Sequence, residues 1–368
     1  MSIPSSRVAA SRPQALGMAR TDKADSTRHA IFLSYAPLHR TSRFCIREGA
    51  IEYERASMKP IRIASRGSKL ALVQSNYIRS RLEELSGEVE VSIVKISTRG
   101  DRDKSDFLNK PDSIGYFTSE VENALLDGRA DVAVHSLKDL PTAYTQGLTI
   151  AAIPQRQSVA DALVTSLDAA SLADLPAGAT VGTSSLRRIA QVRLLRDDLK
   201  CVPLRGNVET RLAKVARGEV DAAIVACAGL HRLGLADRIS AVLPPQEFLP
   251  PPAQGALAVQ IRADDTELAE LVAKLDDRNA RITAETERCI LASMHGGCSI
   301  PLGVYSRIEG HNIIIDALIS DIEGDKHIKR TVTAPIDQAK TTAENLAQEL
   351  LEAGAKEILD KIRPGQID

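Results

Sequence analysis

The sequence predicts an α/β protein with largely parallel sheets, followed by a small α+β domain near its C-terminus. Three observations favour this class. From residue 60 on, short β-branched runs alternate with helical stretches, as in helices layered on parallel sheets. The proline-rich segment LPPQEFLPPPAQG (243–255) cannot form a central strand or a helix interior and indicates a connection between two lobes. After residue 278, strand-like runs are separated only by short turns, which is typical of an antiparallel sheet.

Length and composition narrow the possible functions. The 368 residues exceed one ordinary domain and favour two or three. The chain is 43% hydrophobic and 26% charged, and none of its apolar runs approaches the roughly 18 residues of a membrane span. A net charge of −1 gives no general attraction to nucleic acid, and 3% aromatic residues without tryptophan offer few stacking platforms. We therefore expect a soluble globular protein that binds neither membrane nor nucleic acid.

The cysteines do not form a recognisable framework. There are five, widely spaced and without a CxxC pair, which indicates neither a set of disulfides nor a zinc cage. A reducing compartment, the cytoplasm, fits this usage better. A histidine lies three residues before the last cysteine, but two ligands do not make a site, so we expect no metal. The cysteines are Cys45, Cys201, Cys227, Cys289 and Cys298.

Residues 1–57 differ from the rest of the chain. They carry arginine and serine, lack apolar periodicity, and contain no acidic residue before Asp22. Such a composition fits a transit peptide for organelle import, and it also fits a disordered leader. The favoured interpretation is the leader, because Met58 is followed almost at once by the strand-like run IRIAS. The predicted fold therefore begins near Met58.

The elements of the predicted α/β part alternate in regular order. The runs DGRADVAVHS (127–136) and RGEVDAAIVA (217–226) each read as a helix end, a glycine, an aspartate and a buried strand, which favours two similar lobes. In order, the predicted elements are strand 61–65, helix 69–85, strand 89–97, helix 118–126, strand 131–136, strand 179–185 running into a helix, and helix 208–216.

The last third of the chain changes character. A helix over 278–294 precedes a glycine turn, and the runs VYSRI, NIIIDALISDI and HIKRTVTA then alternate with the turns EGHN and EGDK. These runs predict three antiparallel strands. A helix over 338–361 closes the chain.

Three predicted strand-to-helix junctions carry arginine beside free backbone N–H groups. A cation at the N-terminus of a helix is unfavourable by a few tenths to about 1 kcal/mol, so an anionic group should offset it. Open α/β sheets bind ligands at these strand ends, and guanidinium groups match carboxylates and phosphates. No GxxxxGK[ST] motif indicates a nucleoside triphosphate, so we expect a ligand with several small anionic groups. The residues are Arg66 and Ser68; Ser184 or Ser185 with Arg187 and Arg188; and Arg205, Asn207 and Arg211.

One carboxylate interrupts this basic pattern. HSLKDLP (135–141) follows a buried strand and places Lys138 and Asp139 at its end, just before a proline. An aspartate in this position can simply cap a turn. Beside a cleft lined with arginine, however, it opposes anion binding, and its use would be to stabilise a positive charge that forms during a reaction.

The turn MHGGCSIPLG (294–303) places Cys298 after two glycines and away from any apolar stripe. One interpretation is a cysteine nucleophile working with His295, as in a hydrolase or acyltransferase, although no third group orients the histidine. The glycines would suit an oxyanion site, and they would equally suit unhindered access to the thiol.

Together these motifs resemble the porphobilinogen deaminase (hydroxymethylbilane synthase) family. The resemblance runs from about Ile61 to the C-terminal helix, and although each motif alone is weak, the ordered set is specific. The motifs are ASRGSKLAL, TRGD, ADVAVHSLKDLP, VGTSSLRR, LRGNVETRL, AGLHRLG, AQGA and GGCSIP. The resemblance implies two periplasmic-binding-protein-like (type II) doubly wound lobes and a small α+β C-terminal domain with a three-stranded antiparallel sheet. The implied domains are 60–154 plus 256–273, 160–249 and 278–368, after a leader over 1–57.

The resemblance also implies an activity and a cofactor. A dipyrromethane would be joined to Cys298 by a thioether, leaving the other four cysteines as ordinary thiols. Four porphobilinogen molecules would add head to tail, each losing ammonia, and hydrolysis would release hydroxymethylbilane for tetrapyrrole and heme biosynthesis. The family analogy favours a monomer. Two alternatives remain: a non-catalytic small-anion-binding protein of the same two-lobed fold, and a Cys298-dependent hydrolase or acyltransferase.

Site residues follow from the motif match. Asp139 is the expected catalytic residue, since it could stabilise the cation left when porphobilinogen loses ammonia. The expected cofactor-binding residues are Cys298, Ser68, Lys138, Asp139, Thr183, Ser184, Arg187, Arg188 and Arg205. The expected substrate-binding residues are Arg66, Arg187, Arg211 and Arg232.

One segment departs from the family pattern. The family usually has Gly-Gly-Lys-Gly before a phenylalanine-containing helix, whereas this chain reads PDSIGYFTSE with Ile114 at the lysine position. Ser119 likewise stands where a second lysine is common. We therefore expect the lid loop, about 102–113, to differ in closure, and we assign it no catalytic residue.

Overall fold

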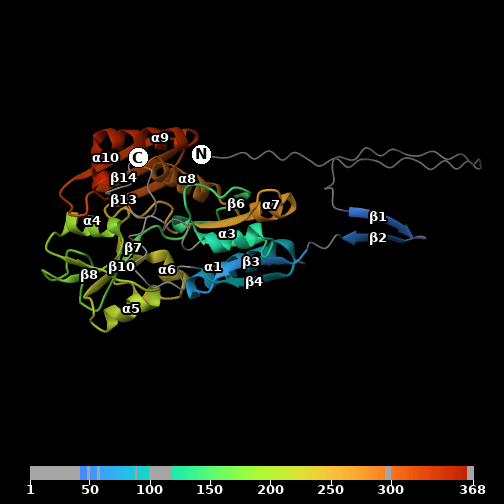
Figure 1. Ribbon diagram of the computed structural model, residues 1–368, viewed down its shortest axis with the longest axis horizontal. Helices are drawn as coiled ribbons and strands as arrows, with labels where there is room; N and C mark the ends of the chain where they lie inside the picture. The colour runs from blue at the N-terminus through green and yellow to red at the C-terminus, as the bar shows by residue number, and fades with distance from the viewer. Residues whose placement is uncertain are drawn as a thin grey trace, which may run out of the picture. The chain divides into compact units, whose positions relative to one another are not determined.

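The computed structural model describes residues 42–47, 50–55, 59–87, 89–98, 118–294 and 300–362. The chain divides into two compact units, 1–56 and 57–368, which we describe separately. In the first unit, β1 (Ser42–Arg47) and β2 (Ala50–Arg55) form an antiparallel pair (Figure 1). These strands lie inside the expected leader, and its role in targeting stays a prediction.

A five-stranded sheet forms the first lobe of the second unit (Figure 1). Its order is β4-β3-β5-β12-β6, and β12 runs antiparallel to the other four strands, which are parallel to one another. Ile63, Val132 and Val259 are completely buried in it, as expected for strands covered on both faces. The strands are β3 (Ile61–Arg66), β4 (Val91–Ile96), β5 (Val132–Ser136), β6 (Leu148–Ala152) and β12 (Leu257–Arg262); helices α1 (Lys69–Ser86), α3 (Ser119–Leu126) and α7 (Thr266–Val272) pack on them.

The second lobe repeats this arrangement. Its sheet has the order β11-β7-β10-β8-β9, with β7 as the one antiparallel strand. When the antiparallel strand that follows a crossing is counted last in each lobe, β4-β3-β5-β12-β6 and β9-β8-β10-β7-β11 have the same strand order. The expectation of two similar, largely parallel α/β lobes is therefore confirmed. The elements are β7 (Asp161–Thr165), β8 (Thr180–Gly182), α4 (Leu186–Leu195), β9 (Lys200–Val202), α5 (Val208–Ala216), β10 (Ala222–Ala226), α6 (Cys227–Arg232) and β11 (Ala241–Leu243).

The chain crosses between the lobes twice. The first crossing (153–160) leads into β7 and the second (244–256) leads into β12, so each lobe's antiparallel strand directly follows a crossing. The second crossing contains the proline-rich segment that predicted a connection, and that prediction is confirmed. The two crossings touch, because the Gln157 backbone N–H donates to the Gly255 carbonyl at 3.2 Å.

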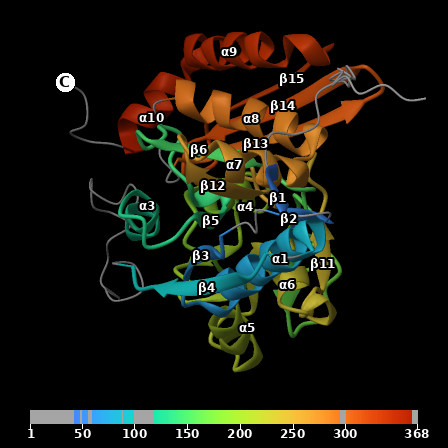
Figure 2. The same cartoon turned by 90° about the vertical axis from the view of Figure 1, so that its right-hand side faces the viewer.

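The C-terminal part is a three-stranded antiparallel sheet covered by helices, as predicted (Figure 2). Apolar side chains of α8, β13, β14 and α9 form its core. One expectation is wrong in detail: the single helix over 338–361 is interrupted because Gly354 has a φ of +109°, which is not helical. The elements are α8 (Arg278–Ser293), β13 (Leu302–Glu309), β14 (Asn312–Ser320), β15 (His327–Pro335), α9 (Ala339–Leu350) and α10 (Lys356–Ile362).

None of the described helices has both the length and the apolar character to cross a membrane. Among the described residues, no group of three or more histidine, cysteine, aspartate or glutamate side chains is arranged to hold a metal ion.

Candidate active site

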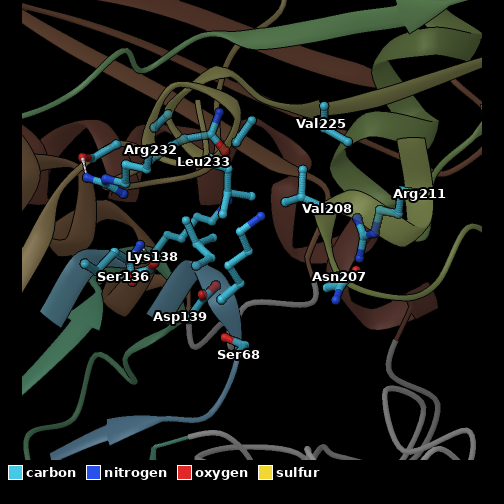
Figure 3. A pocket seen from close by; sticks show the side chains of 18 of the residues that line it. Ser68, Ser136, Lys138, Asp139, Asn207, Val208, Arg211, Val225, Arg232 and Leu233 are labelled. Carbon is cyan, nitrogen blue, oxygen red and sulfur yellow. Dashed lines mark hydrogen bonds between the residues drawn. The ribbon is translucent and has the colours of Figure 1, made fainter. Parts of the chain in front are cut away.

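A cavity of about 330 Å³ lies between the two lobes (Figure 3). It is lined by the β3–α1 junction and the end of β5 from the first lobe, by α5 and α6 from the second, and by the second crossing. In the described part of the chain, six basic side chains and two acidic ones line it, so it attracts anions. The basic residues are Arg66, Lys69, Lys138, Arg188, Arg211 and Arg232, and the acidic residues are Asp139 and Glu209.

The β3–α1 junction begins a helix as the sequence predicts. Ser68 is the N-cap of α1, and its hydroxyl accepts a hydrogen bond from the Ala71 N–H at 3.3 Å. Arg66 and Ser68 both line the cavity. The junction thus brings a guanidinium group and the N-terminus of an 18-residue helix to the same wall.

Lys138 and Asp139 occupy a short 3₁₀ turn directly after β5. Leu137 is fully buried and fixes the turn to the core, whereas Asp139 is exposed and lines the cavity. Figure 3 shows Asp139 and Ser68 on one side of the cavity and Asn207 and Arg211 on the other. Burial lowers the pKa of the Lys138 ammonium group, and the neighbouring Asp139 carboxylate partly opposes that shift.

Arg288 of α8, which was not predicted as a site residue, holds the backbone of this turn by hydrogen bonds. Arg288 of α8 is 5% exposed, and its guanidinium donates to the carbonyls of Leu137 at 3.1 Å, Leu140 at 2.7 Å and Pro141 at 2.7 Å. The helix that leads to the Cys298 turn therefore also fixes the backbone on both sides of Asp139. A signal was present in the sequence, since Arg288 shares the buried helix face of Ala284 and Leu291.

Arg187 and Arg188 are buried at the start of α4, where they share a carboxylate that the sequence reasoning also missed. Arg187 donates to Asp161 Oδ2 at 2.7 Å, and Arg188 donates to Oδ1 at 2.7 Å and Oδ2 at 3.2 Å. Asp161 is completely buried at the start of β7. The anion expected beside these arginines is thus in part a residue of the protein itself.

The charges of this cluster shift the pKa values of Asp161 and Arg187. Burial alone would raise the pKa of Asp161, but the two guanidinium groups outweigh it and hold that pKa well below its usual range. Burial lowers the pKa of Arg187 to about 10, against the opposing attraction of Asp161. One carboxylate between two guanidinium groups leaves the cluster with one net positive charge.

Arg211 and Arg232 line the same cavity but are held differently. Arg211 Nε donates to the Gly206 carbonyl at 2.9 Å, and Arg232 donates to the Gly255 carbonyl at 2.7 Å. Both side chains are half-buried, and burial lowers the pKa of each to about 10. Arg188 also lowers the pKa of Arg211. Among the described residues, neither arginine forms an ion pair with a carboxylate, and Asp139 attracts the charge of Arg211 from a distance. Both charges therefore remain available to a ligand in the cavity.

Three expected ligand residues, Thr183, Ser184 and Arg205, do not line this cavity or the smaller cavity beside it. The Thr183 hydroxyl accepts from the Ser185 N–H at 3.2 Å, ahead of α4. The Ser184 hydroxyl donates to the Leu204 carbonyl and accepts from the Leu204 N–H, both at 3.2 Å. Arg205 is exposed in the loop that follows β9. These contacts hold the loops around α4, and the three ligand roles stay predictions.

A second cavity of about 160 Å³ adjoins the first. Lys138, Asp139 and Arg188 line both, so these residues stand where the two spaces meet. Cys298, His295 and the lid loop lie outside the described residues. Ile300, two residues along the chain from Cys298, lines this second cavity together with Arg187.

Comparisons with known proteins identify the family. The model of the porphobilinogen deaminase dipyromethane cofactor binding domain matches residues 61–270, and the model of the porphobilinogen deaminase C-terminal domain matches residues 281–353. Porphobilinogen deaminase of Maridesulfovibrio salexigens is 47% identical over 83% of this chain and 99% of that protein. The corresponding values are 46%, 83% and 97% for Nitratidesulfovibrio vulgaris strain Hildenborough, and 43%, 83% and 100% for Xanthomonas axonopodis pv. citri strain 306. The chain therefore belongs to the porphobilinogen deaminase family.

Proposed function

We propose that this protein joins four porphobilinogen molecules head to tail, with loss of one ammonia from each, and releases hydroxymethylbilane by hydrolysis. The observation that carries the proposal is Asp139, an exposed carboxylate at the meeting point of two cavities whose other charged lining residues, among those described, are mostly basic. A site that only bound anions would gain nothing from it. The family match supports the same conclusion and gives no support to an anion-binding protein or a Cys298-dependent hydrolase.

The residues present fit a dipyrromethane. Its acetate and propionate arms require cations, and the second cavity offers Lys138, Arg187 and Arg188 beside Ile300. We infer that these three residues hold the cofactor and that Cys298 carries it. When bound, the dipyrromethane supplies the pyrrole carbon on which the product chain begins.

Asp139 stabilises positive charge that develops on the substrate. Loss of ammonia from porphobilinogen leaves a cation conjugated with the pyrrole ring, and a carboxylate beside it lowers its energy. A pair of unit charges about 4 Å apart at an effective dielectric constant near 20 is worth about 4 kcal/mol, or about a thousandfold in rate. The backbone around Asp139 is held by Arg288, so little reorganisation is needed when the charge forms.

The remaining cations bind the carboxylate arms of the incoming substrate. Arg66, Arg211 and Arg232 line the larger cavity, and Ser68 adds a hydroxyl group. Because the pKa values of Arg211 and Arg232 are about 10, only about one molecule in a thousand loses the charge at pH 7. Binding of the arms therefore persists throughout the neutral range.

The cofactor assignment is tested by intact-protein mass. The purified active protein should exceed the mass of its sequence by two pyrrole units, and acid Ehrlich reagent should colour it. The Cys298→Ser variant should show neither property and no turnover. An active protein with an unmodified Cys298 would refute the assignment.

We also infer that the protein works as a monomer in the cytoplasm. The family analogy supports the monomer, and three described cysteines, Cys201, Cys227 and Cys289, are free thiols, which suits a reducing compartment. Light scattering on the purified protein tests the first point, and a dimer mass would exclude it. Expression with a fluorescent protein fused to the C-terminus tests the second, and import into an organelle would exclude it.

A further inference from the structure

The side chain of Gln254 links the two halves of the site. It lies on the second crossing, is completely buried, and lines the larger cavity. Its Nε2 donates to the Val159 carbonyl at 2.8 Å and to Asp161 Oδ1 at 2.9 Å, and its Oε1 accepts from Lys138 Nζ at 3.1 Å. One amide therefore joins the lysine of the first lobe to the carboxylate that holds the arginine pair of the second.

The orientation of this amide is determined by its partners. The groups around Nε2 are carbonyl and carboxylate oxygens, which only accept hydrogen bonds. The nitrogen must face them, so the oxygen must face the Lys138 ammonium group, which only donates. Rotating the amide by 180° would set the carbonyl oxygen against Asp161 and the NH₂ group against the lysine.

The backbone leaves little freedom to this arrangement. Gly255 has a φ of +87°, and a Cβ there would lie 2.4 Å from the Gln157 carbonyl oxygen. Ala253 has a φ of +61°, which is unusual for a residue other than glycine. The residues before and after Gln254 thus have restricted backbone conformations, and at Gly255 the two crossings are in close contact. The position from which the Gln254 side chain enters the site is therefore fixed.

We propose that Gln254 is a positioning residue that holds the Lys138 ammonium group at the junction of the two cavities. This inference rests on the proposed function and deepens it. A lysine side chain has four rotatable bonds, and Arg187 and Arg188 repel its charge while Asp139 and Asp161 attract it. The attraction of the two carboxylates has no strict direction, whereas a hydrogen bond does. The Gln254 oxygen, whose position is set by the partners of Nε2, gives the ammonium group a directed acceptor 3.1 Å from Nζ.

The test compares Gln254→Met with Gln260→Met. Gln260 is a matched control, since it is equally buried and bonds His135 and Glu122 within the first lobe, away from both cavities. The first readout is independent of turnover: the rate at which acetic anhydride acetylates Lys138 in the holoenzyme, followed against pH by peptide mass spectrometry. Loss of an acceptor disfavours the ammonium form, so the midpoint should fall by about one pH unit in Gln254→Met and stay in place in Gln260→Met.

The second readout is a double-mutant cycle on hydroxymethylbilane formation. Gln254→Met should lower kcat about tenfold in the wild-type background and have little further effect in a Lys138→Met background. Equal effects in both backgrounds, or an unchanged acetylation midpoint, would overturn the proposal. If Gln254→Met yields no folded protein, Gln254→Asn, which keeps the amide but shortens its reach, carries the same predictions. Failure of the wild-type protein to form hydroxymethylbilane would refute the proposed function, while the acetylation readout would still test the role of Gln254.

Discussion

The arginines of the site fall into two groups, which differ in how their positive charges are held beside the cavities. Arg187 and Arg188 are 3% and 6% exposed and share the buried carboxylate of Asp161. Arg211 and Arg232 are half-buried, and among the described residues their guanidinium groups donate to the backbone carbonyls of Gly206 and Gly255. The first pair is fixed before any ligand arrives, whereas the second pair keeps its charge for a ligand.

This difference suits two kinds of anion. A cofactor that stays bound profits from a rigid, preformed site, because less conformational freedom is lost on binding. Porphobilinogen, of which four molecules enter in each turnover, profits from cations that no carboxylate of the described residues holds in an ion pair beforehand. The two groups therefore predict separable effects on cofactor retention and on substrate affinity.

Asp161→Asn should have the largest effect, because it removes the feature that distinguishes the two groups. Two buried guanidinium groups would lose their counter-ion, which costs about 3 to 5 kcal/mol in comparable buried pairs. Urea unfolding should show that loss, and intact mass should show incomplete cofactor loading. Asp316→Asn is the control, since Asp316 is also buried and paired with an arginine but lies in the C-terminal sheet. It should lose stability and keep its cofactor; equal loading in both variants would contradict the preformed-site argument.

Asp139→Asn should lower turnover about a thousandfold, or about 4 kcal/mol, while the free energy of unfolding changes little. The substitution keeps the shape of an exposed side chain and removes only its charge. Initial rates of hydroxymethylbilane formation and urea unfolding measure the two quantities. Turnover near that of the wild type would remove Asp139 from its catalytic role.

Arg211→Met should raise KM for porphobilinogen about tenfold, because one charged hydrogen bond to a carboxylate arm is lost. Cofactor loading and stability should stay near wild-type values, in contrast to Asp161→Asn. Steady-state kinetics and intact mass check both expectations. A loss of cofactor comparable to that in Asp161→Asn would mean that the two groups of arginines do not have separate roles.

Glu209→Gln should have the smallest effect. Glu209 accepts from Lys69 Nζ at 2.7 Å across the mouth of the larger cavity, but the two side chains are 38% and 61% exposed. Ion pairs of this exposure contribute less than about 1 kcal/mol and weaken with salt. Turnover should change by less than about threefold at 0.15 M salt. A loss as large as that of Asp139→Asn would mean that any carboxylate of this cavity is critical.

Much of the site could be predicted because its residues lie at the ends of strands. Arg66, Lys138 and Asp139 each follow a β-branched run, and the carboxyl ends of parallel strands meet at one edge of a sheet. Hydrophobic periodicity and capping preference are local properties of the sequence, so Ser68 could be recognised as a helix cap from the sequence alone.

The parts that were missed depend on contacts between distant segments. Asp161 lies 26 residues before Arg187, Gln254 lies 116 residues after Lys138, and Arg288 lies 151 residues after Leu137. Nothing in a local pattern indicates which buried polar group will meet which partner. The break in the last helix was missed for a different reason, since a glycine inside a helical pattern is often tolerated.

The paired crossings also determine which parts of the site can move. Two covalent connections at one place resist twisting and leave bending as the easy motion between the lobes, and a bend displaces each atom in proportion to its distance from the axis. Gln254 and Asp161 lie on or beside the crossings, so any such bend leaves them almost still. Lys69 and Glu209 lie on helices of opposite lobes, so a bend between the lobes would change the distance between them. The cavity can therefore change its volume while the charged groups beside the crossings keep their spacing.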